Sequence, residues 1–162
     1  MIAALQPEAL LTAARKLARQ TGSGRPRQAE LRRAVSTAYY AVFHELAREA
    51  ADTLVGKANR RTIPRAWAQV YRALNHGRVK SACRSDAFKN RFPDKIRSFG
   101  DGFIALQVKR HDADYDPRLP RLSLATVLDD IATAEQIIAD FRLASPIDRR
   151  AFCVFVMHDV RG

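Results

Sequence analysis

The stretch from Leu31 to Ala47, LRRAVSTAYYAVFHELA, decides the fold of this chain. Its apolar residues recur at three- and four-residue spacing, the period of the buried side of a helix; they are Leu31, Val35, Ala38, Tyr39, Val42 and Leu46. A second set at the same spacing, on another side of the helix, consists of Arg33, Thr37, Tyr40 and His44. Side chains at such offsets stack above one another and form a column. The stretch therefore predicts a helix that contributes to both a core and a site.

Helical periodicity continues through most of the chain. We expect helices over residues 7–20, 28–54, 64–74, 94–109 or slightly beyond, 124–141 and about 146–157, with one or two further turns over 78–83. Residues 57–62 and 85–93 are expected to be loops. Gly100 and Gly102, inside one expected helix, indicate either a close helix contact or a kink. No strand-like alternation appears, so we predict an all-α antiparallel bundle of about five to six helices.

Positive charge is concentrated in one quarter of the chain. The 162 residues carry 28 Lys and Arg against 17 Asp and Glu, and residues 56–97 hold 12 of the former and 2 of the latter. Such a local field is typical of a polyanion-binding surface, although an arginine-rich proteome would also produce it. The candidate nucleic-acid-binding residues are Arg60, Arg61, Arg65, Arg72, His76, Arg78, Lys80 and Arg84. The interleaved aromatic residues Trp67, Tyr71, Phe88 and Phe92 are expected in the core, so this prediction depends on the charges.

Three segments together resemble the HEPN family of small all-helical domains. The run Ser36–His44 (STAYYAVFH) is similar to the family's second helix, Leu106–Pro117 (LQVKRHDADYDP) to the start of its later part, and Leu124–Phe141 to its closing helix. The resemblance covers roughly residues 5 to 145. It implies a helical bundle that acts as a dimer and, in many relatives, a metal-independent ribonuclease with an Arg followed four to six residues later by a His.

The resemblance places the candidate catalytic residues in the segment RHDADY, with Arg110, His111, Asp114 and Tyr115. His111 follows Arg110 directly, and Asp114 and Tyr115 stand where the family's His would fall. The resemblance also implies that Arg33, Tyr40 and His44 border the same cleft. A structural alternative pairs Arg110 with Asp114 and packs Tyr115 beneath the following loop. Arg72 and His76, four residues apart, form a second candidate pair on another helix.

Several classes of function find no support in the sequence. No apolar run approaches the roughly 18 residues of a membrane span, and no secretory signal is visible, so we expect a cytoplasmic protein. Cys83 and Cys153 are expected to be reduced thiols. Asp112, Asp114 and Asp116 are not followed by the Gly and Glu of a calcium loop, because Pro117 and Ser123 stand there. We therefore expect no metal and no cofactor.

The chain divides into a bundle over residues 1–145 and a C-terminal segment 146–162, whose last part, AFCVFVMHDVRG (151–162), is apolar nearly all round. This segment is expected either to pack on the bundle or to form a homodimer interface. The leading hypothesis is a protein that binds RNA or another nucleotide polyanion, either as a metal-independent ribonuclease of a defence or toxin–antitoxin system or as a module that does not cleave. The alternative is a non-catalytic subunit that docks on a companion protein, such as a cognate antitoxin, through this helix.

Overall fold

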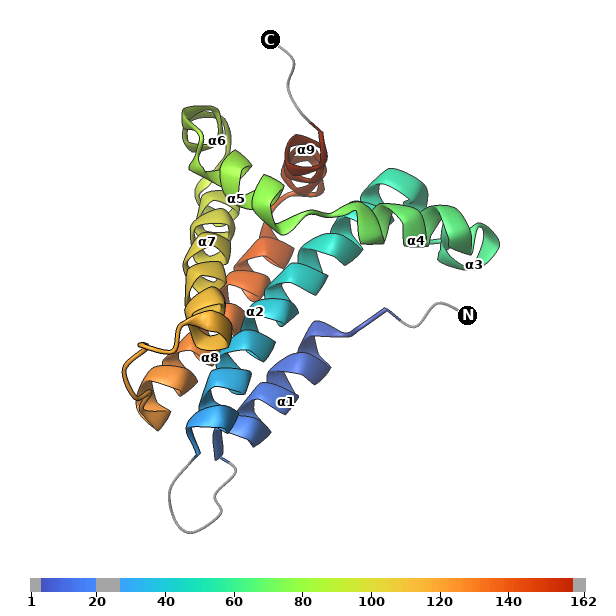
Figure 1. Cartoon of the computed structure of the whole chain (residues 1–162). Coiled ribbons are helices and arrows are strands. Elements are labelled where there is room, and N and C mark those ends of the chain that lie inside the picture. Colours follow the sequence, from blue (N-terminus) through green and yellow to red (C-terminus); the bar gives the residue numbers. More distant parts are fainter. Residues whose placement is uncertain (1–3, 20–26, 159–162) are drawn as a thin grey trace.

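The computed structural model describes residues 4–19 and 27–158, and it contains helices and no strand in that part of the chain (Figure 1). The α-helices are α1 (Pro7–Arg19), α2 (Gln28–Ala51), α3 (Asn59–Thr62), α4 (Pro64–Ala73), α5 (His76–Arg84), α6 (Asp86–Arg91), α7 (Asp94–Tyr115), α8 (Leu124–Leu143) and α9 (Pro146–Met157), and the π-helix η1 (Asp52–Gly56) follows α2 directly. The predicted all-α bundle is confirmed, with more short helices than expected.

Helix α2 lies at the centre of the bundle, where it packs against α1, α7 and α8 along its length and against α4 and α9 near its end. The predicted apolar stripe from Leu31 to Leu46 is buried throughout. Burial extends beyond that stripe to Ala34, Ala41 and Ala47, whose small side chains allow neighbouring helices to approach closely. Because α2 is enclosed on most sides, its contact with solvent is confined to the polar column and to polar residues near its two ends.

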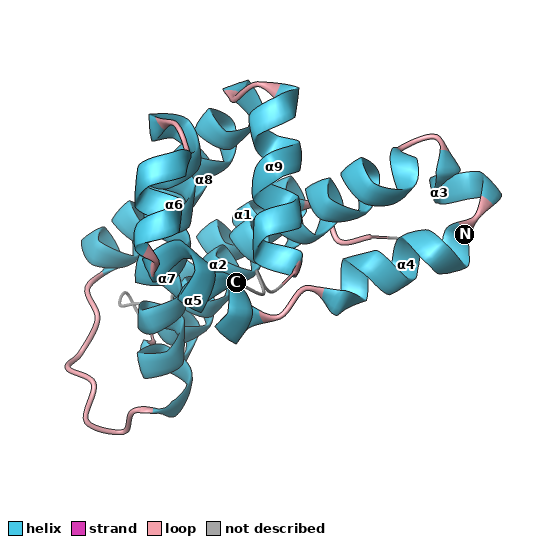
Figure 2. Cartoon of the chain, turned by 90° about the horizontal axis from the view of Figure 1, so that it is seen from above, coloured by secondary structure: helices cyan, strands magenta, loops and turns pink. Residues whose placement is uncertain are grey.

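Helices α3 and α4 form an arm that projects from the bundle, as Figure 2 shows from above. The chain turns into the arm through η1, which ends at Gly56 with a positive φ of 104° that favours glycine. Trp67 holds α4 against η1, because its ring is fully buried and its Nε1 donates to Asp52 Oδ1 at 2.8 Å. The guanidinium of Arg60 lies 4.5 Å from the centre of the same ring.

Two expected loops are short helices instead. Residues 59–62 form α3, and residues 86–91 form α6, in which the Ser85 hydroxyl accepts a hydrogen bond from the Phe88 backbone N–H as an N-cap. Helix α7 is six residues longer than predicted and includes the whole RHDADY segment. By contrast, the helix starts at Pro7, Ser123 and Ser145 agree with the sequence.

The glycines of α7 mark close helix contacts. A Cβ atom at Gly100 would lie 2.5 Å from Cζ of the buried Phe88, and one at Gly102 would lie 2.7 Å from Cδ1 of Ile137. Neither position leaves room for a larger side chain without movement of its neighbour. The close-contact interpretation of these glycines is therefore confirmed.

Helix α9 packs on the bundle through one face. Phe152, Cys153 and Val156 are buried, and the Phe152 ring lies 5.7 to 6.0 Å from those of Phe88, Phe99 and Phe141. Ile147 and Val154, on the outer face, are exposed, as is Leu143 at the end of α8. Only a narrow apolar surface is thus left for another chain, and homodimerisation stays a prediction.

The length and hydropathy of the helices also bear on membranes. None of the helices in the described part of the chain combines the length and the apolar character needed to cross a bilayer.

Candidate functional site

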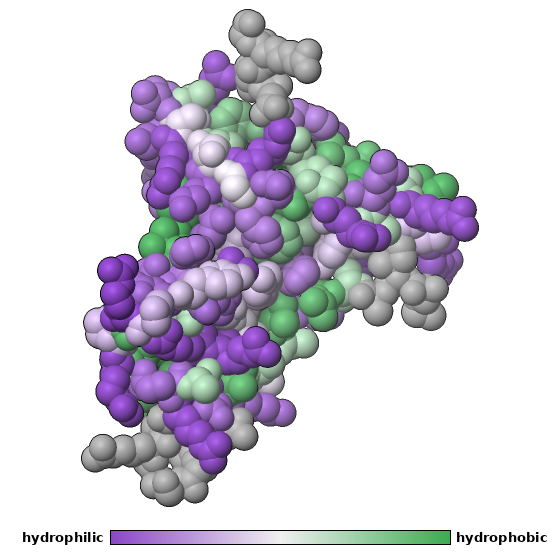
Figure 3. Space-filling view, in the orientation of Figure 1, coloured by the Kyte–Doolittle hydropathy of each residue, from purple (hydrophilic) through white to green (hydrophobic). Residues whose placement is uncertain are grey.

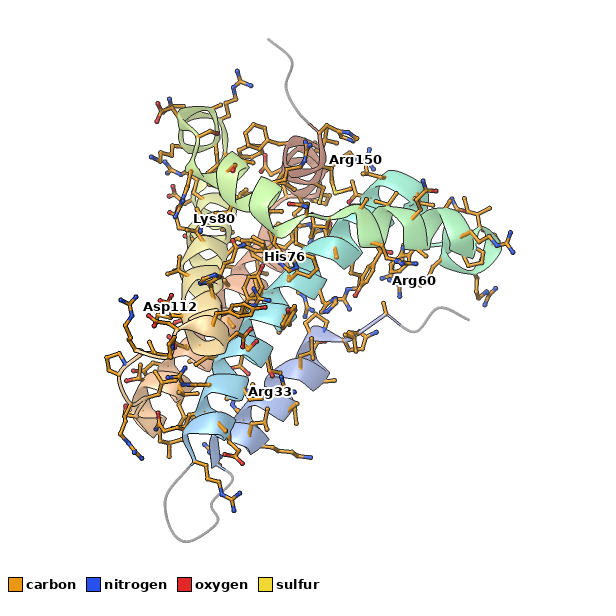
Figure 4. The ribbon with its side chains drawn as sticks, in the orientation of Figure 1. Arg33, Arg60, His76, Lys80, Asp112 and Arg150 are labelled. Atoms are coloured by element: carbon orange, nitrogen blue, oxygen red, sulfur yellow. The ribbon has the colours of Figure 1, made fainter. Side chains whose placement is uncertain are left out.

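A group of aromatic, histidine and arginine side chains meets where α2, α4, α5 and α7 come together, and we call it the Tyr–His–Arg cluster. Its members are Tyr39, Tyr40 and His44 from α2, Tyr71 from α4, His76 from α5 and Arg110 from α7. Figure 4 shows His76 at the start of α5, in the middle of the face that α2 and α7 share. Tyr39 is completely buried, while the other members are partly exposed.

Arg110 joins α7 to the polar column of α2. Its Nη2 donates to the Tyr40 hydroxyl at 3.0 Å, and its Nε lies 3.0 Å from Asp114 Oδ2 in an i,i+4 ion pair. The buried Ser36 hydroxyl donates to the same carboxylate oxygen at 3.1 Å. The predicted Arg110–Asp114 pair is therefore confirmed. This pair leaves further N–H donors of the guanidinium available, because the group has five of them and the Arg110 side chain is 19% exposed.

His76 sits in an aromatic setting formed mainly by α2. Its Nδ1 lies 2.5 Å from the Tyr39 hydroxyl, and its ring stacks on Phe43 with 3.9 Å between centroids. The Tyr40 ring meets it edge-on at 6.2 Å. Burial, together with the charges of Arg110 and His44, lowers the pKa of His76 below its ordinary value. At neutral pH the ring is therefore uncharged.

A second tyrosine–histidine pair lies one turn further along α2. His44 Nδ1 is 2.5 Å from the Tyr71 hydroxyl, and the two rings are stacked with 5.7 Å between centroids. Burial lowers the pKa of His44. Burial also raises the pKa of Tyr71, and a backbone hydrogen bond from Leu5 offsets part of that effect. Both histidines are thus neutral rings held by a protonated tyrosine.

The buried tyrosine decides where the proton of neutral His76 resides. Burial raises the pKa of Tyr39, so its hydroxyl keeps its proton and needs an acceptor. Among the described residues the group within reach is His76 Nδ1, and we assign the proton of this contact to Tyr39. A ring that accepts at Nδ1 carries its own proton on Nε2. In this tautomer His76 Nε2 is a hydrogen-bond donor and has no lone pair to take up a proton.

The two lowered histidine pKa values predict an acid-sensitive fold. We expect the free energy of unfolding to fall as the pH drops through about 6.5, the ordinary histidine pKa, because the unfolded chain then binds protons that the folded chain does not. Above that pH both states are neutral and the stabilisation is complete. Urea unfolding at a series of pH values between about 5 and 8 measures the slope. The double variant His44→Gln, His76→Gln should flatten it, and an unchanged slope contradicts the assignment.

The other predicted catalytic residues fall outside the cluster. His111 is exposed on the outer side of α7, where its Nδ1 lies 3.9 Å from Asp112 Oδ1. Tyr115 is also exposed, so the prediction that it packs beneath the loop is wrong. Arg33 is exposed nearly two turns before Tyr40, near the lower end of α2 in Figure 4, and makes no contact with the cluster within the described residues. Tyr40 contacts Arg110 directly, and His44 lies next to Tyr40 with 6.2 Å between ring centroids, whereas Arg33 does not reach the cluster.

The predicted nucleic-acid-binding residues spread over α3, α4 and α5, on the arm and the adjoining end of the bundle. Arg60 is engaged by Asp52, with 3.1 Å from Nη2 to Oδ1. Arg61, Arg65, Arg72 and Arg84 are exposed, and no carboxylate of the described residues pairs with them. Arg65 and Arg72 line one open depression on α4. Arg78 and Lys80, on α5, are partly exposed. Of the four aromatics predicted for the core, Trp67 and Phe88 are buried, whereas Tyr71 and Phe92 are partly exposed and pack against the core.

Hydrophilic side chains cover much of the face that contains the cluster, as Figure 3 shows. Among the described residues no group of three or more His, Cys, Asp or Glu side chains is arranged to hold a metal ion. The donors at hand are guanidinium, hydroxyl and imidazole N–H groups, which bind oxyanions. The arrangement is therefore suited to phosphate.

Comparison with known proteins identifies no relative of this chain. No protein-family model matches the chain, and no curated protein or solved structure matches it. The geometry of the cluster and the charge around it therefore carry the functional argument.

Proposed function

We propose that this protein is a HEPN-like domain that binds RNA or another nucleotide polyanion and holds one phosphate at the Tyr–His–Arg cluster. The hydrogen-bonding character of the cluster carries the proposal. Arg110 presents its remaining N–H groups, His76 presents Nε2–H, and Tyr40, which accepts from Arg110, has its own O–H to donate. Donors of this kind on one partly exposed surface favour a phosphate over a cation or a neutral group.

The charge around the cluster supports a long polyanion more than a single small anion. Residues 56–97, with a net charge of +10, build the arm, α5, α6 and the first turn of α7, and His76 opens α5. A strand with one phosphate at the cluster has arginines on either side of it, at Arg65 and Arg72 on α4 and at Arg84 on α5. Arginine is the side chain best matched to phosphate, because its planar fork donates two parallel hydrogen bonds.

Binding without cleavage is the activity that the tautomer of His76 supports. RNA cleavage without a metal needs a base that takes the 2′-hydroxyl proton, and His76 Nε2 already carries a proton while Tyr39 occupies Nδ1. Tyr71 occupies His44 Nδ1 in the same way. The proposal places the protein in the cytoplasm, where its two buried cysteines stay reduced.

A salt titration of binding to a labelled single-stranded RNA tests this proposal. Fluorescence anisotropy should show an affinity that falls with salt, with a log–log slope of about −0.7 for each contacted phosphate. We expect a slope of about −2 or steeper, which corresponds to three contacted phosphates, one at the cluster and one at each of two arginines. A slope near zero, or no binding at low salt, contradicts the proposal and favours an acidic protein as the partner of the basic surface.

The same RNA incubated with the protein in EDTA shows whether binding is accompanied by cleavage. We expect the strand to stay intact. Cleavage that disappears in the variant His76→Gln would keep the phosphate site and overturn the assignment of His76 as a donor only.

A further inference from the structure

Two exposed aromatic side chains stand beside Arg110 at the end of α7, and the phosphate site described above does not use them. Tyr115 is 64% exposed, and the side chain of His111, one turn earlier, is 68% exposed. Their ring centroids are 5.3 Å apart. No other tyrosine, phenylalanine or tryptophan in the described part of the chain is exposed. We call this pair the aromatic platform.

Arg110 connects the aromatic platform to the phosphate donors. Its guanidinium carbon lies 5.6 Å from the centre of the Tyr115 ring and 5.5 Å from the centre of the Tyr40 ring. A group held by Arg110 and Tyr40 is therefore a short step from the Tyr115 ring. A ribose bridges such a step between the phosphate and the base of one nucleotide.

The charges around the aromatic platform favour a base over a second phosphate. Asp112 lies next to His111, and Asp116 follows Tyr115 and is fastened to the chain by the Arg118 backbone N–H at 2.8 Å. Figure 4 labels Asp112 near the C-terminal end of α7. Carboxylates repel phosphate, but they accept hydrogen bonds from the exocyclic amino groups of nucleobases. The two rings are tilted by 51° to each other, the carboxylates of Asp112 and Asp116 border them, and Arg118 Nε lies 3.4 Å from the Asp116 carboxylate.

We infer that Tyr115, with His111 beside it, stacks an unpaired nucleobase of the strand whose phosphate Arg110 holds. This inference rests on the proposed function and assigns its substrate class, since a base can stack here only when it is unpaired in its own strand. Stacking on tyrosine is open to every base, because each base has a π-face. The site therefore selects single-stranded over duplex RNA.

Substitution of Tyr115 tests the inference with the intact protein and a short labelled single-stranded RNA. We expect Tyr115→Ala to weaken binding about 5- to 100-fold and Tyr115→Phe to bind within about twofold of the unaltered protein, because the ring and not the hydroxyl stacks. On a ribose-phosphate strand of equal length that lacks bases, Tyr115→Ala should bind as the unaltered protein does. Tyr115 is exposed, so thermal unfolding of Tyr115→Ala should match the unaltered protein.

The outcomes separate this inference from the proposed function. Equal affinity of Tyr115→Ala and the unaltered protein for the base-containing strand overturns the platform, as does an equal loss on the strand without bases, which would mean that Tyr115 only positions Arg110. If Tyr115→Ala keeps its RNA affinity but changes its oligomeric state, the inference is overturned and Tyr115 forms a contact between protein chains. If neither strand binds the unaltered protein, the proposed function fails as well.

Discussion

Replacing Glu45 by alanine is expected to lower the free energy of unfolding by about 3 kcal/mol, the largest effect on stability that we predict for a polar residue. Glu45 is 2% exposed on α2, and both its oxygens accept from Arg142 at 2.8 Å. Arg48 donates to the same carboxylate at 2.7 Å. Removal of the carboxylate leaves Arg142 with Glu8 and Arg48 with Gln6 as their remaining side-chain partners. The cost lies at the lower end of the range for buried pairs because the Arg142 side chain is 38% exposed and regains water.

A matched pair on the surface provides the control for Glu45. Glu135 on α8 also accepts two hydrogen bonds from one arginine, Arg15 of α1, but that pair is largely in contact with solvent. Glu135→Ala should therefore cost less than about 1 kcal/mol. Urea unfolding at neutral pH measures both variants. Similar losses for the two would show that burial of Glu45 does not set its contribution.

The helical period made α2 predictable, because a side chain's environment along a regular helix follows from its spacing. The same reasoning missed α3 and α6, whose six or fewer residues are too short to show a period. For α6 the Ser85 cap was the available signal. Reasoning from the helical period also ended α7 too early, because the polar residues of RHDADY resemble a loop although they continue the helix to Tyr115.

The candidate site was predictable only where it follows one helix. Tyr40 and His44 belong to the column on α2, and the Arg110–Asp114 pair follows from i,i+4 spacing. The contacts that define the donors join residues 27 to 70 positions apart, as in His44–Tyr71, Tyr39–His76 and Tyr40–Arg110. No local pattern encodes them. Tyr39 counted as a core residue by its period, and it is one, yet its hydroxyl sets the tautomer of a histidine on another helix.

Replacing Arg110 by alanine is expected to weaken RNA binding about 10- to 100-fold at moderate salt, the largest functional effect among our predictions, because hydrogen bonds to a charged group contribute about 1.5–3 kcal/mol each. Removal of one phosphate contact should also reduce the salt slope by about 0.7 for a single strand. Arg110→Lys should lie between alanine and the unaltered protein, since it keeps the charge but cannot donate to Tyr40 and a phosphate through one planar fork.

Arg150→Ala is the control for a general loss of charge, because Arg150 is exposed on α9 and contributes the same formal charge without touching the cluster (Figure 4). Its affinity for RNA should stay within about twofold of the unaltered protein, since an isolated exposed charge contributes little on its own. Arg110 also pairs with Asp114, so thermal unfolding of each variant must accompany the titration. If a folded Arg110→Ala or Arg110→Lys protein binds RNA with the affinity and slope of Arg150→Ala, phosphate is not held at this cluster, and the surface charge of the arm alone accounts for binding.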